Sequence, residues 1–232
     1  MERFERTERL IGKECINKLK KAHVAVFGIG GVGSYSAEAF ARSGIGEMDI
    51  FDSDIIDITN INRQIIALSS TVGKNKVDVE KERILDINPA ARVNAYKVFL
   101  NPEVINEINF CEYDYVVDAI DNVTAKVSIC EAAAKNNIPV ISAMGAGNRL
   151  DPTEFEIAPI EKTSGCPLAR VMRTELRKRG ITNVKAVFSR QPALKTSAFS
   201  ENRRAVPASI AYVPSVMGLL IAKEVICDII NN

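Results

Sequence analysis

Glycines near the start of the chain have the spacing of a phosphate-binding turn, G-x-G-x-x-G. The turn follows a short apolar stretch, precedes helix-forming residues that continue to about Ser43, and contains Gly28, Gly30, Gly31 and Gly33. Glycine lets a backbone turn tightly and approach a phosphate, and a helix N-terminus offers free N–H groups to it. Asp52 comes nineteen residues after Gly33, where a carboxylate can accept hydrogen bonds from ribose hydroxyls. This pattern predicts a nucleotide site; the alternative is a tight turn that only packs a strand against a helix.

Polar residues after Asp52 extend the predicted site. They include a second acid, two amides and a guanidinium, from Asp54, Asn60, Gln64 and Arg63. Arginine can bind phosphate oxygens with two parallel hydrogen bonds. An ordinary loop of turn-forming Asp and Asn is the alternative. The position of these residues at a strand's carboxyl end, where open parallel sheets bind ligands, favours the nucleotide reading.

Two further places add charge to the same predicted edge. Lys74 and Lys76 precede a helix expected to run to Ile87, although the helix dipole disfavours cations there. A lysine at that position can be a phosphate ligand or a solvated side chain. Asp121 and Asn122 follow the apolar stretch 113–120. Asp121 can hold Mg²⁺, or one of the two can cap the next helix.

The elements that must position these residues alternate between strands and helices. Strands are expected at 23–27, 48–51, 92–100, 113–120 and 138–143, with helices between them. This order predicts an α/β fold, a Rossmann-like, doubly wound and mainly parallel sheet with helices on both faces. A smaller α+β section should follow, with strands at 155–158, 184–189 and 208–212 and helices at 167–179 and 215–230. We expect one compact domain with an N-terminal helical arm (1–22), a nucleotide-binding section (23–150) and a C-terminal section (151–232).

Composition bounds the class of protein. The apolar share of 47% suffices for a large core, and the net charge is only +1. The five cysteines form no C-x-x-C pair, so neither zinc-ligand spacing nor a disulfide framework is indicated. The charged start MERFERTERL is unlike a signal sequence, and apolar runs are too short to span a membrane. A cytoplasmic protein with reduced thiols is expected.

Charge is unevenly distributed along the chain. Between Lys162 and Arg204 eleven basic residues face two acidic ones, so this section carries +9 and the remainder −8. Such an excess predicts a polyanionic partner. In the expected helix 167–179, Arg170, Arg173 and Arg177 should form one stripe, followed by Lys178, while Leu168, Val171, Met172 and Leu176 face inward. A solvated basic helix is the alternative, and the same holds for Arg3, Arg6 and Arg9 in the arm.

Five motifs, in order and spacing, resemble the ubiquitin-activating-enzyme-like superfamily that includes MoeB, ThiF and HesA. They are GIGGVG at 28–33, FDSD at 51–54, TNINRQ at 59–64, VGKNK at 72–76 and DAIDN at 118–122. The resemblance implies ATP and Mg²⁺, adenylation of a carboxylate, and a homodimer. It implies Asp52 as the ribose ligand and Asp121 as the magnesium-linked acid, with phosphates handled by Asn60, Arg63, Gln64 and Lys76. Arg6 or Arg9 would reach the partner's ATP.

Further segments resemble the tRNA threonylcarbamoyladenosine dehydratases within that superfamily. They include RFERTERLIG, INPAARV, TSGCPLARVMRTELRKRG and SIAYVPSVMGLLIAKEVI. The resemblance implies that ATP activates the carboxylate of threonylcarbamoyladenosine in tRNA, which then cyclises with release of AMP. The basic section, with Arg170, Arg173, Arg177 and Lys178, would dock the tRNA.

Other readings stay open beside this one. The chain can instead activate the C-terminal carboxylate of a ubiquitin-like sulfur carrier, although the paired C-x-x-C motifs of MoeB and ThiF are missing. A nucleotide-binding scaffold without activity is disfavoured by Arg63, Lys76 and Asp121. The resemblance leaves room for a sulfur-relay protein as a further partner. Cys166 can form a thioester, as in ubiquitin-activating relatives, or simply lie at a helix entry.

Overall fold

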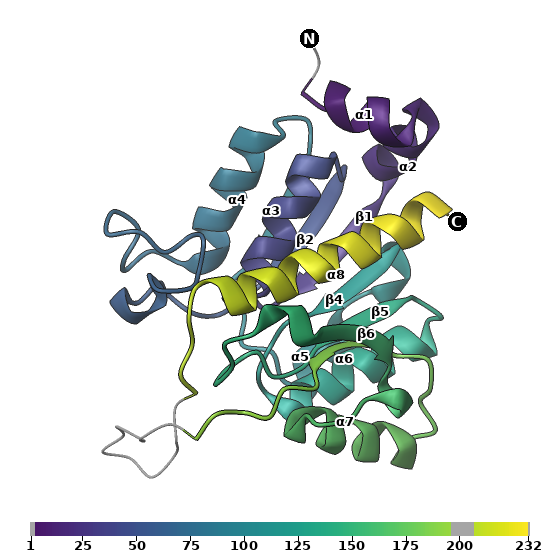
Figure 1. The fold of residues 1–232 in the computed structure, drawn as a ribbon. Coiled ribbons are helices and arrows are strands. Elements are labelled where there is room, and N and C mark those ends of the chain that lie inside the picture. The colour runs from purple at the N-terminus through teal and green to yellow at the C-terminus, as the bar shows by residue number, and fades with distance from the viewer. Residues whose placement is uncertain (1–2, 196–206, 232) are drawn as a thin grey trace.

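A seven-stranded sheet forms the centre of the computed structural model, which describes residues 3–195 and 207–231 (Figure 1). The strand order is β3-β2-β1-β4-β5-β7-β6, and every neighbouring pair is parallel except β6 with β7. The strands are β1 (His23–Phe27), β2 (Glu47–Phe51), β3 (Arg92–Tyr96), β4 (Tyr115–Asp118), β5 (Val140–Ala143), β6 (Phe155–Pro159) and β7 (Lys185–Ser189). The predicted α/β class, with a mainly parallel sheet, is confirmed.

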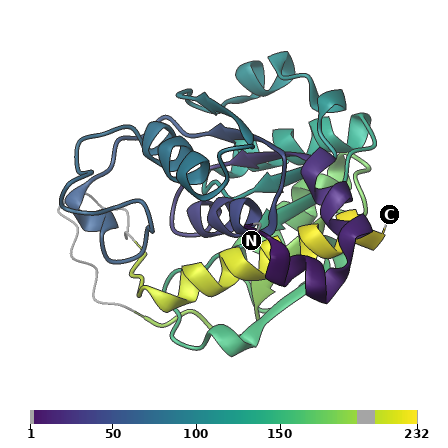
Figure 2. The same cartoon turned by 90° about the horizontal axis from the view of Figure 1, so that it is seen from above.

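Helices cover both faces of the sheet. On one face lie α2 (Lys13–Lys21), α3 (Gly33–Ser43), α4 (Lys76–Ile87) and α8 (Tyr212–Asn231). On the other lie α5 (Pro102–Glu107), α6 (Val123–Lys135) and α7 (Pro167–Lys178). Seen from above, α8 runs beside α3, with α1 (Glu5–Ile11) and α2 near its C-terminal end (Figure 2).

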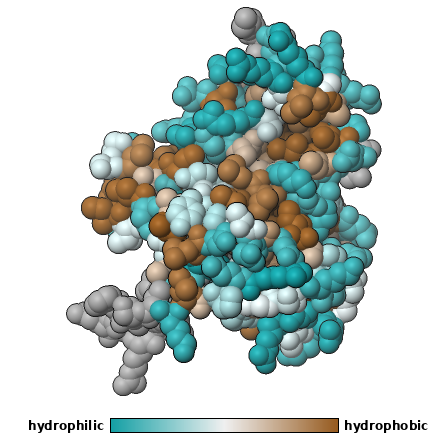
Figure 3. Space-filling view, in the orientation of Figure 1, coloured by the Kyte–Doolittle hydropathy of each residue, from teal (hydrophilic) through white to brown (hydrophobic). Residues whose placement is uncertain are grey.

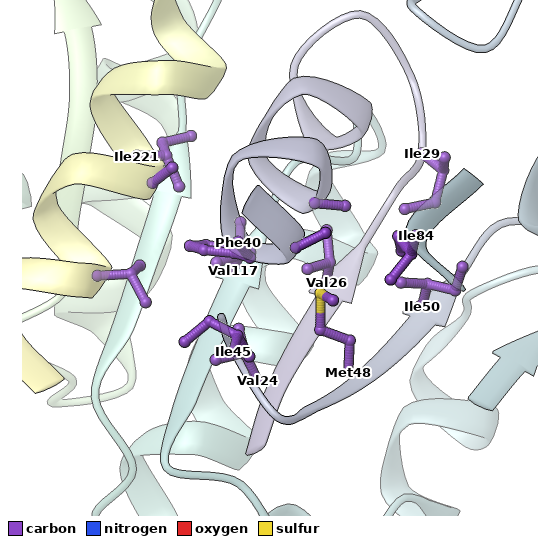
Figure 4. Close-up of a cluster of buried hydrophobic side chains, with 14 of the residues drawn as sticks. Val24, Val26, Ile29, Phe40, Ile45, Met48, Ile50, Ile84, Val117 and Ile221 are labelled. Carbon is purple, nitrogen blue, oxygen red and sulfur yellow. The ribbon is translucent and has the colours of Figure 1, made fainter. Parts of the chain in front are cut away.

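Alternation along β1 explains how the two cores form. Val24 and Val26 point into one apolar cluster, whereas Ala25 and Phe27 point into the other. In the first cluster Val26 and Val117 from the strands meet Phe40 of α3 (Figure 4). Because a strand buried on both faces has no polar alternation, β1 reads in sequence as a continuous apolar run.

The order of the strands fixes where a ligand can bind. From β1 the chain moves outward to β2 and β3, then returns to the opposite side of β1 as β4. The loops after β1 and β4 therefore diverge, and open a crevice at the carboxyl edge of the sheet.

Three expected strands differ in the structure. The strand expected at 113–120 is shorter, since β4 spans only Tyr115–Asp118. β3 ends at Tyr96 instead of Leu100, because Tyr96 pairs with Phe51, the last residue of β2. The expected strand 208–212 is absent from the described residues 207–211, and α8 already begins at Tyr212. Pro214 is compatible with this early start, since the first turn of a helix needs no N–H donor.

The arm consists of two short helices rather than one. Gly12, with φ of 87°, separates α1 from α2. Arg3 precedes the helix and donates to the carbonyls of Asp86 and Ile87 at the end of α4, so it does not share a helical face with Arg6 and Arg9. None of the helices in the described ranges is both long and apolar enough to cross a membrane.

Candidate active site

A cavity of about 540 Å³ opens at the carboxyl edge of the sheet, between the loops that follow β1, β2 and β4. It gathers eleven of the twelve residues predicted for nucleotide binding: Gly28, Gly30, Gly31, Asp52, Asp54, Asn60, Arg63, Gln64, Lys76, Asp121 and Asn122. The structure thus brings together residues that lie more than ninety positions apart in sequence.

The positions of the turn require glycine for different physical reasons. A Cβ on Gly30 would meet nothing within 4 Å, so this backbone faces the open cavity. Gly28 has φ of 92°, and a Cβ there would lie 2.9 Å from the Ala119 carbonyl. A Cβ on Gly33 would lie 1.8 Å from the Gly28 oxygen. Gly33 is therefore required for close packing of α3 on β1, and it is the one predicted member that does not line the cavity.

Asp52 is fixed at the end of β2 by two backbone donors. The Ile29 N–H donates to Oδ2 at 2.8 Å and the Asp54 N–H donates to Oδ1 at 2.9 Å. Burial raises the pKa of this carboxyl, although the Lys76 ammonium and the two N–H groups oppose the rise. The first of these bonds ties the acid directly to the glycine-rich turn.

Lys76 is the first residue of α4 and is only 5% exposed. Its ammonium lies 2.6 Å from Asp54 Oδ2 and 3.6 Å from Asp52 Oδ2. These acids offset the unfavourable helix dipole and hold a cation against the cavity wall. Lys74, the alternative phosphate ligand, is exposed and does not line the cavity.

The segment after β2 forms a short 3-10 turn, Ile58–Asn60, that presents the guanidinium. Asn60 accepts from the Asp57 N–H at 3.0 Å and so closes a capping box. Arg63 Nη1 donates to the Thr59 carbonyl and to Asn62 Oδ1, both at 2.9 Å. Gln64 is buried, and its Oε1 has no hydrogen-bond partner among the described residues. Gln64 lines the cavity, so its side-chain amide is available to a ligand bound there.

The alternatives at Asp121 and Asn122 are resolved by the capping geometry. Asn122 Oδ1 accepts from the Ala125 N–H at 3.0 Å and caps α6. Asp121 lines the cavity and is exposed, and within residues 3–195 and 207–231 it forms no ion pair or side-chain hydrogen bond. Its carboxylate therefore remains available to a ligand.

The sequence does not predict an ionic cluster that lies behind the cavity. Lys126 and Asp118 are fully buried and lie 2.9 Å apart, and Ser142 donates to the same carboxylate. The only hint in the sequence is a cation in the first turn of α6, where the helix dipole disfavours it. Val98, Phe99 and Leu100 form another part of the cavity wall, whereas the sequence pattern predicts a strand there.

The predicted tRNA-docking residues on α7 lie outside the cavity lining. Arg170, Arg177 and Lys178 are exposed, but Arg173 Nη1 donates to the Thr163 carbonyl at 2.7 Å and is held in the fold. Lys178 pairs with Glu175 at 2.7 Å.

The expected inward face of α7 is confirmed for Met172 and Leu176 and wrong for Val171. Val171 is 45% exposed because Ala169 takes the buried position. Arg203 and Arg204 lie outside the described residues.

Cys166 and the arm complete the set of candidates. Cys166 is 5% exposed and occupies the N-cap position of α7, which agrees with the helix-entry reading. Arg9 pairs with Glu5 on the same helix, and Arg6 is exposed. Among the described residues that line the cavity, neither of these arginines is present.

Comparisons with known proteins give the chain a family and named relatives. The ThiF family profile matches residues 4–232. The tRNA threonylcarbamoyladenosine dehydratase of Bacillus subtilis is 44% identical over 100% of this chain and 96% of its own. The Escherichia coli enzyme of that name is 40% identical over 81% of this chain and 73% of its own.

Solved structures extend the likeness to three dimensions. The E. coli dehydratase, TcdA, in complex with ATP superimposes with a TM-score of 0.90 at 34% identity, covering 99% of this chain and 94% of the other. The same enzyme has been solved in complex with AMP. With the profile spanning nearly the whole sequence and the curated relatives agreeing with it, this chain belongs to the ThiF family.

Proposed function

We propose that this protein is an ATP-dependent tRNA-modifying enzyme, a tRNA threonylcarbamoyladenosine dehydratase. It adenylates the carboxylate of the threonylcarbamoyl group on a tRNA adenosine and promotes the cyclisation of that group. The observation that carries the proposal is the cavity that gathers Asp52, Arg63, Lys76 and Asp121 at the sheet's carboxyl edge. A relative of similar length with the same name, and an ATP-bound structure of the same fold, support it.

Each residue has a role in the first half of the reaction. The substrate carboxylate attacks the α-phosphorus, and pyrophosphate leaves. Asp52 accepts hydrogen bonds from the ribose, and the open backbone at Gly30 admits the phosphates. Arg63, Lys76, Asn60 and Gln64 bind phosphate oxygens and stabilise charge that develops during transfer.

The second half of the reaction needs little from the protein. AMP is a good leaving group, whereas the oxide of a free carboxylate is not. An internal nucleophile of the same threonylcarbamoyl group attacks the activated carbonyl and AMP departs. Ring closure within one group benefits from a high effective molarity. No covalent enzyme intermediate is required, so Cys166 is assigned a structural role.

Mg²⁺ fits the same cavity. Asp121 offers a free carboxylate, the oxygen ligand that Mg²⁺ prefers, while the carboxylates of Asp52 and Asp54 lie against the Lys76 ammonium. Asp121 would hold the ion, which supplies positive charge to the triphosphate. The ion would keep most of its water ligands, as Mg²⁺ usually does in proteins.

A homodimer would complete the site. Arg6 is exposed on α1, which lies far from the loops of its own cavity (Figure 1). Leu10 on the same helix is 85% exposed, and Ile55, Ile58 and Leu68 beside the cavity are 56%, 68% and 52% exposed. The space-filling view has apolar surface over this segment (Figure 3). Apolar surface on both parts suits an isologous contact that delivers Arg6 or Arg9 to the partner's cavity.

Further features of the enzyme are proposed with it. The protein works in the cytoplasm, where its tRNA substrate resides, and its five cysteines are free.

The chain acts as one unit made of the arm 1–22, the nucleotide-binding section 23–150 and the C-terminal section 151–232. In the last of these sections, tRNA docking involves Arg170, Arg177 and Lys178. A sulfur-relay protein is a further partner. Activation of a ubiquitin-like sulfur carrier is the weaker alternative, because the C-x-x-C pair is missing.

The test is exchange of radiolabelled pyrophosphate into ATP. We expect Mg²⁺-dependent exchange that requires tRNA carrying threonylcarbamoyladenosine, and AMP formation with loss of one water from the modified nucleoside. Unmodified tRNA is the matched control. Exchange with a sulfur-carrier protein but not with tRNA would support the alternative instead. Calorimetry with ATP and NAD checks the nucleotide, since tighter binding of NAD would overturn the assignment.

A further inference from the structure

The loop between β4 and α6 carries Asp121 into the cavity, and a buried lysine holds it from behind. Lys126 lies on α6 and its side chain is 0% exposed. Its ammonium donates to the Ala143 carbonyl at 2.8 Å and to the Ile120 carbonyl at 3.2 Å, and it lies 2.9 Å from Asp118 Oδ2. These three acceptors match the three N–H donors of an ammonium group.

The three acceptors belong to different elements. Asp118 ends β4, Ile120 lies in the loop, and Ala143 ends β5. Lys126 therefore ties two neighbouring strand ends to the residue immediately before Asp121. On the opposite side the Ala119 N–H donates to the Phe27 carbonyl at 2.8 Å, and Gly28 lies against the Ala119 carbonyl. Contacts on both sides of the loop therefore hold Ala119 and Ile120, the residues before Asp121, in a single conformation.

We propose that Lys126 is a positioning residue for adenylation, holding the Ile120 carbonyl so that Asp121 presents its carboxylate to the nucleotide and its metal ion. This inference rests on the proposed function, since it assigns a task to Asp121. A charge buried at this depth is costly, and a neutral core would be at least as stable. The lysine's contacts explain its presence, because a neutral apolar side chain cannot hold two carbonyls and a carboxylate together.

The test separates positioning from charge balance. Lys126→Met leaves Asp118 buried and unpaired, so that variant can fail for reasons of stability alone. The variant Asp118→Asn/Lys126→Met removes both charges and leaves the Ile120 carbonyl without its donor. We expect it to fold, with an adenylation rate at saturating ATP about 100-fold below wild type, as for a misplacement of about 1 Å. Full wild-type rate would show that Lys126 only balances Asp118, and would overturn the proposal.

A control variant removes a lysine of another ionic cluster. Lys185 on β7 pairs with Glu224 and Asp228 of α8, away from the cavity. Lys185→Met should lower the melting temperature and leave the adenylation rate of the folded protein unchanged. An equal loss of rate in both variants would attribute the effect to general destabilisation and would count against positioning.

Two further readouts connect Lys126 to Asp121. In a protein that already carries Asp121→Asn, adding Asp118→Asn/Lys126→Met, the charge-neutral variant, should reduce the adenylation rate by less than about threefold. The effects of substitutions at coupled residues are not additive. Calorimetry should show that Mg²⁺ no longer strengthens ATP binding in the charge-neutral variant, although ATP alone still binds. Fully additive effects with an unchanged Mg²⁺ contribution would overturn the inference. An inactive wild-type chain would instead refute the proposed function.

Discussion

Asp121 provides the sharpest prediction at the residue scale. Its carboxylate is exposed in the cavity and has no partner within the described ranges, so replacing it changes little in the folded protein. Asp121→Asn should reduce pyrophosphate exchange by about 10²–10³-fold, the usual cost of losing one charge-placing group. The melting temperature should stay within about 2 °C, as for most surface substitutions.

The matched control is Asp86→Asn, another exposed acid, which lies in α4 and does not line the cavity. Pyrophosphate exchange by this variant should equal that of wild type. If Asp121→Asn exchanged pyrophosphate at the wild-type rate, Asp121 would have no role in the reaction.

Glu80 predicts a pH dependence of stability. It is fully buried on α4, and both carboxyl oxygens have no partner in the part of the chain that the structure describes. Burial raises the pKa of Glu80 well above its usual value of 4.5; Glu38 on α3 adds to the rise, and Arg83 opposes it. The folded state therefore keeps a proton that the unfolded state loses, so stability falls as pH rises above 4.5.

Glu80→Gln removes this proton uptake while keeping the shape of the side chain. The free energy of unfolding of Glu80→Gln minus that of wild type should grow by up to about 1.4 kcal/mol per pH unit above the unfolded pKa. Urea denaturation between about pH 5 and pH 8 measures it. A difference that stays constant over this range would mean that Glu80 is ionised in the folded protein.

Individual residues differ in how far the sequence predicts them. The glycines and Asp52 were predictable because backbone approach and ribose binding need those residue types at fixed spacing. The sequence does not predict whether Asp121 or Asn122 caps α6, since both residue types serve equally well as caps. Lys126 was missed because a lysine in an amphipathic helix is normally solvated, and only the tertiary structure brings the three acceptors to it.

At the scale of elements, α7 predicts a docking surface narrower than the charge pattern suggested. Arg170 and Arg177 are exposed, whereas Arg173 is bound to Thr163. Arg170→Ala/Arg177→Ala should weaken tRNA binding and lower its salt slope by about 0.7–0.9 for each phosphate group that the variant no longer binds. ATP affinity should not change. Filter binding at several salt concentrations measures the affinity for tRNA and its salt slope.

A control removes the same charge from another face. Lys20 and Lys21 are exposed on α2, and Lys20→Ala/Lys21→Ala should leave the salt slope unchanged. If the two double variants behave alike, tRNA binding follows net charge and α7 is not the docking element.

Strand and helix boundaries followed from local patterns except where tertiary structure decides. The central strands β1, β4 and β5 were predictable from their apolar runs, whereas β3 (RVNAY) has no such run. The end of β3 depends on the length of β2, which pairs with it residue by residue. Residues 208–211 resemble a strand, but Pro207 and Ala208 lie against the turn at Gly147 and Asn148, so these residues meet a loop instead of a strand.

At the scale of the whole molecule, Arg6 and Arg9 on α1 do not line the cavity of their own chain, and α1 lies apart from its loops (Figure 1). The proposed homodimer therefore predicts that an Arg6→Ala/Arg9→Ala chain and an Asp121→Asn chain complement each other. In a mixed dimer, the intact cavity of the first chain receives the intact arginines of the second. Random exchange of equal amounts should restore about a quarter of the wild-type sites, because half of the dimers are mixed and each has one complete site.

Each variant alone should be nearly inactive, and activity should appear only after subunit exchange, measured by pyrophosphate exchange on the mixed sample. Native mass spectrometry with one chain isotope-labelled establishes that exchange has occurred. No recovery in a sample with confirmed mixed dimers would mean that the arginines act within their own chain or not at all. In that case the exposed apolar side chains of α1 and of the segment beside the cavity would need another partner, since Leu10 and Ile58 are 85% and 68% exposed in the single chain.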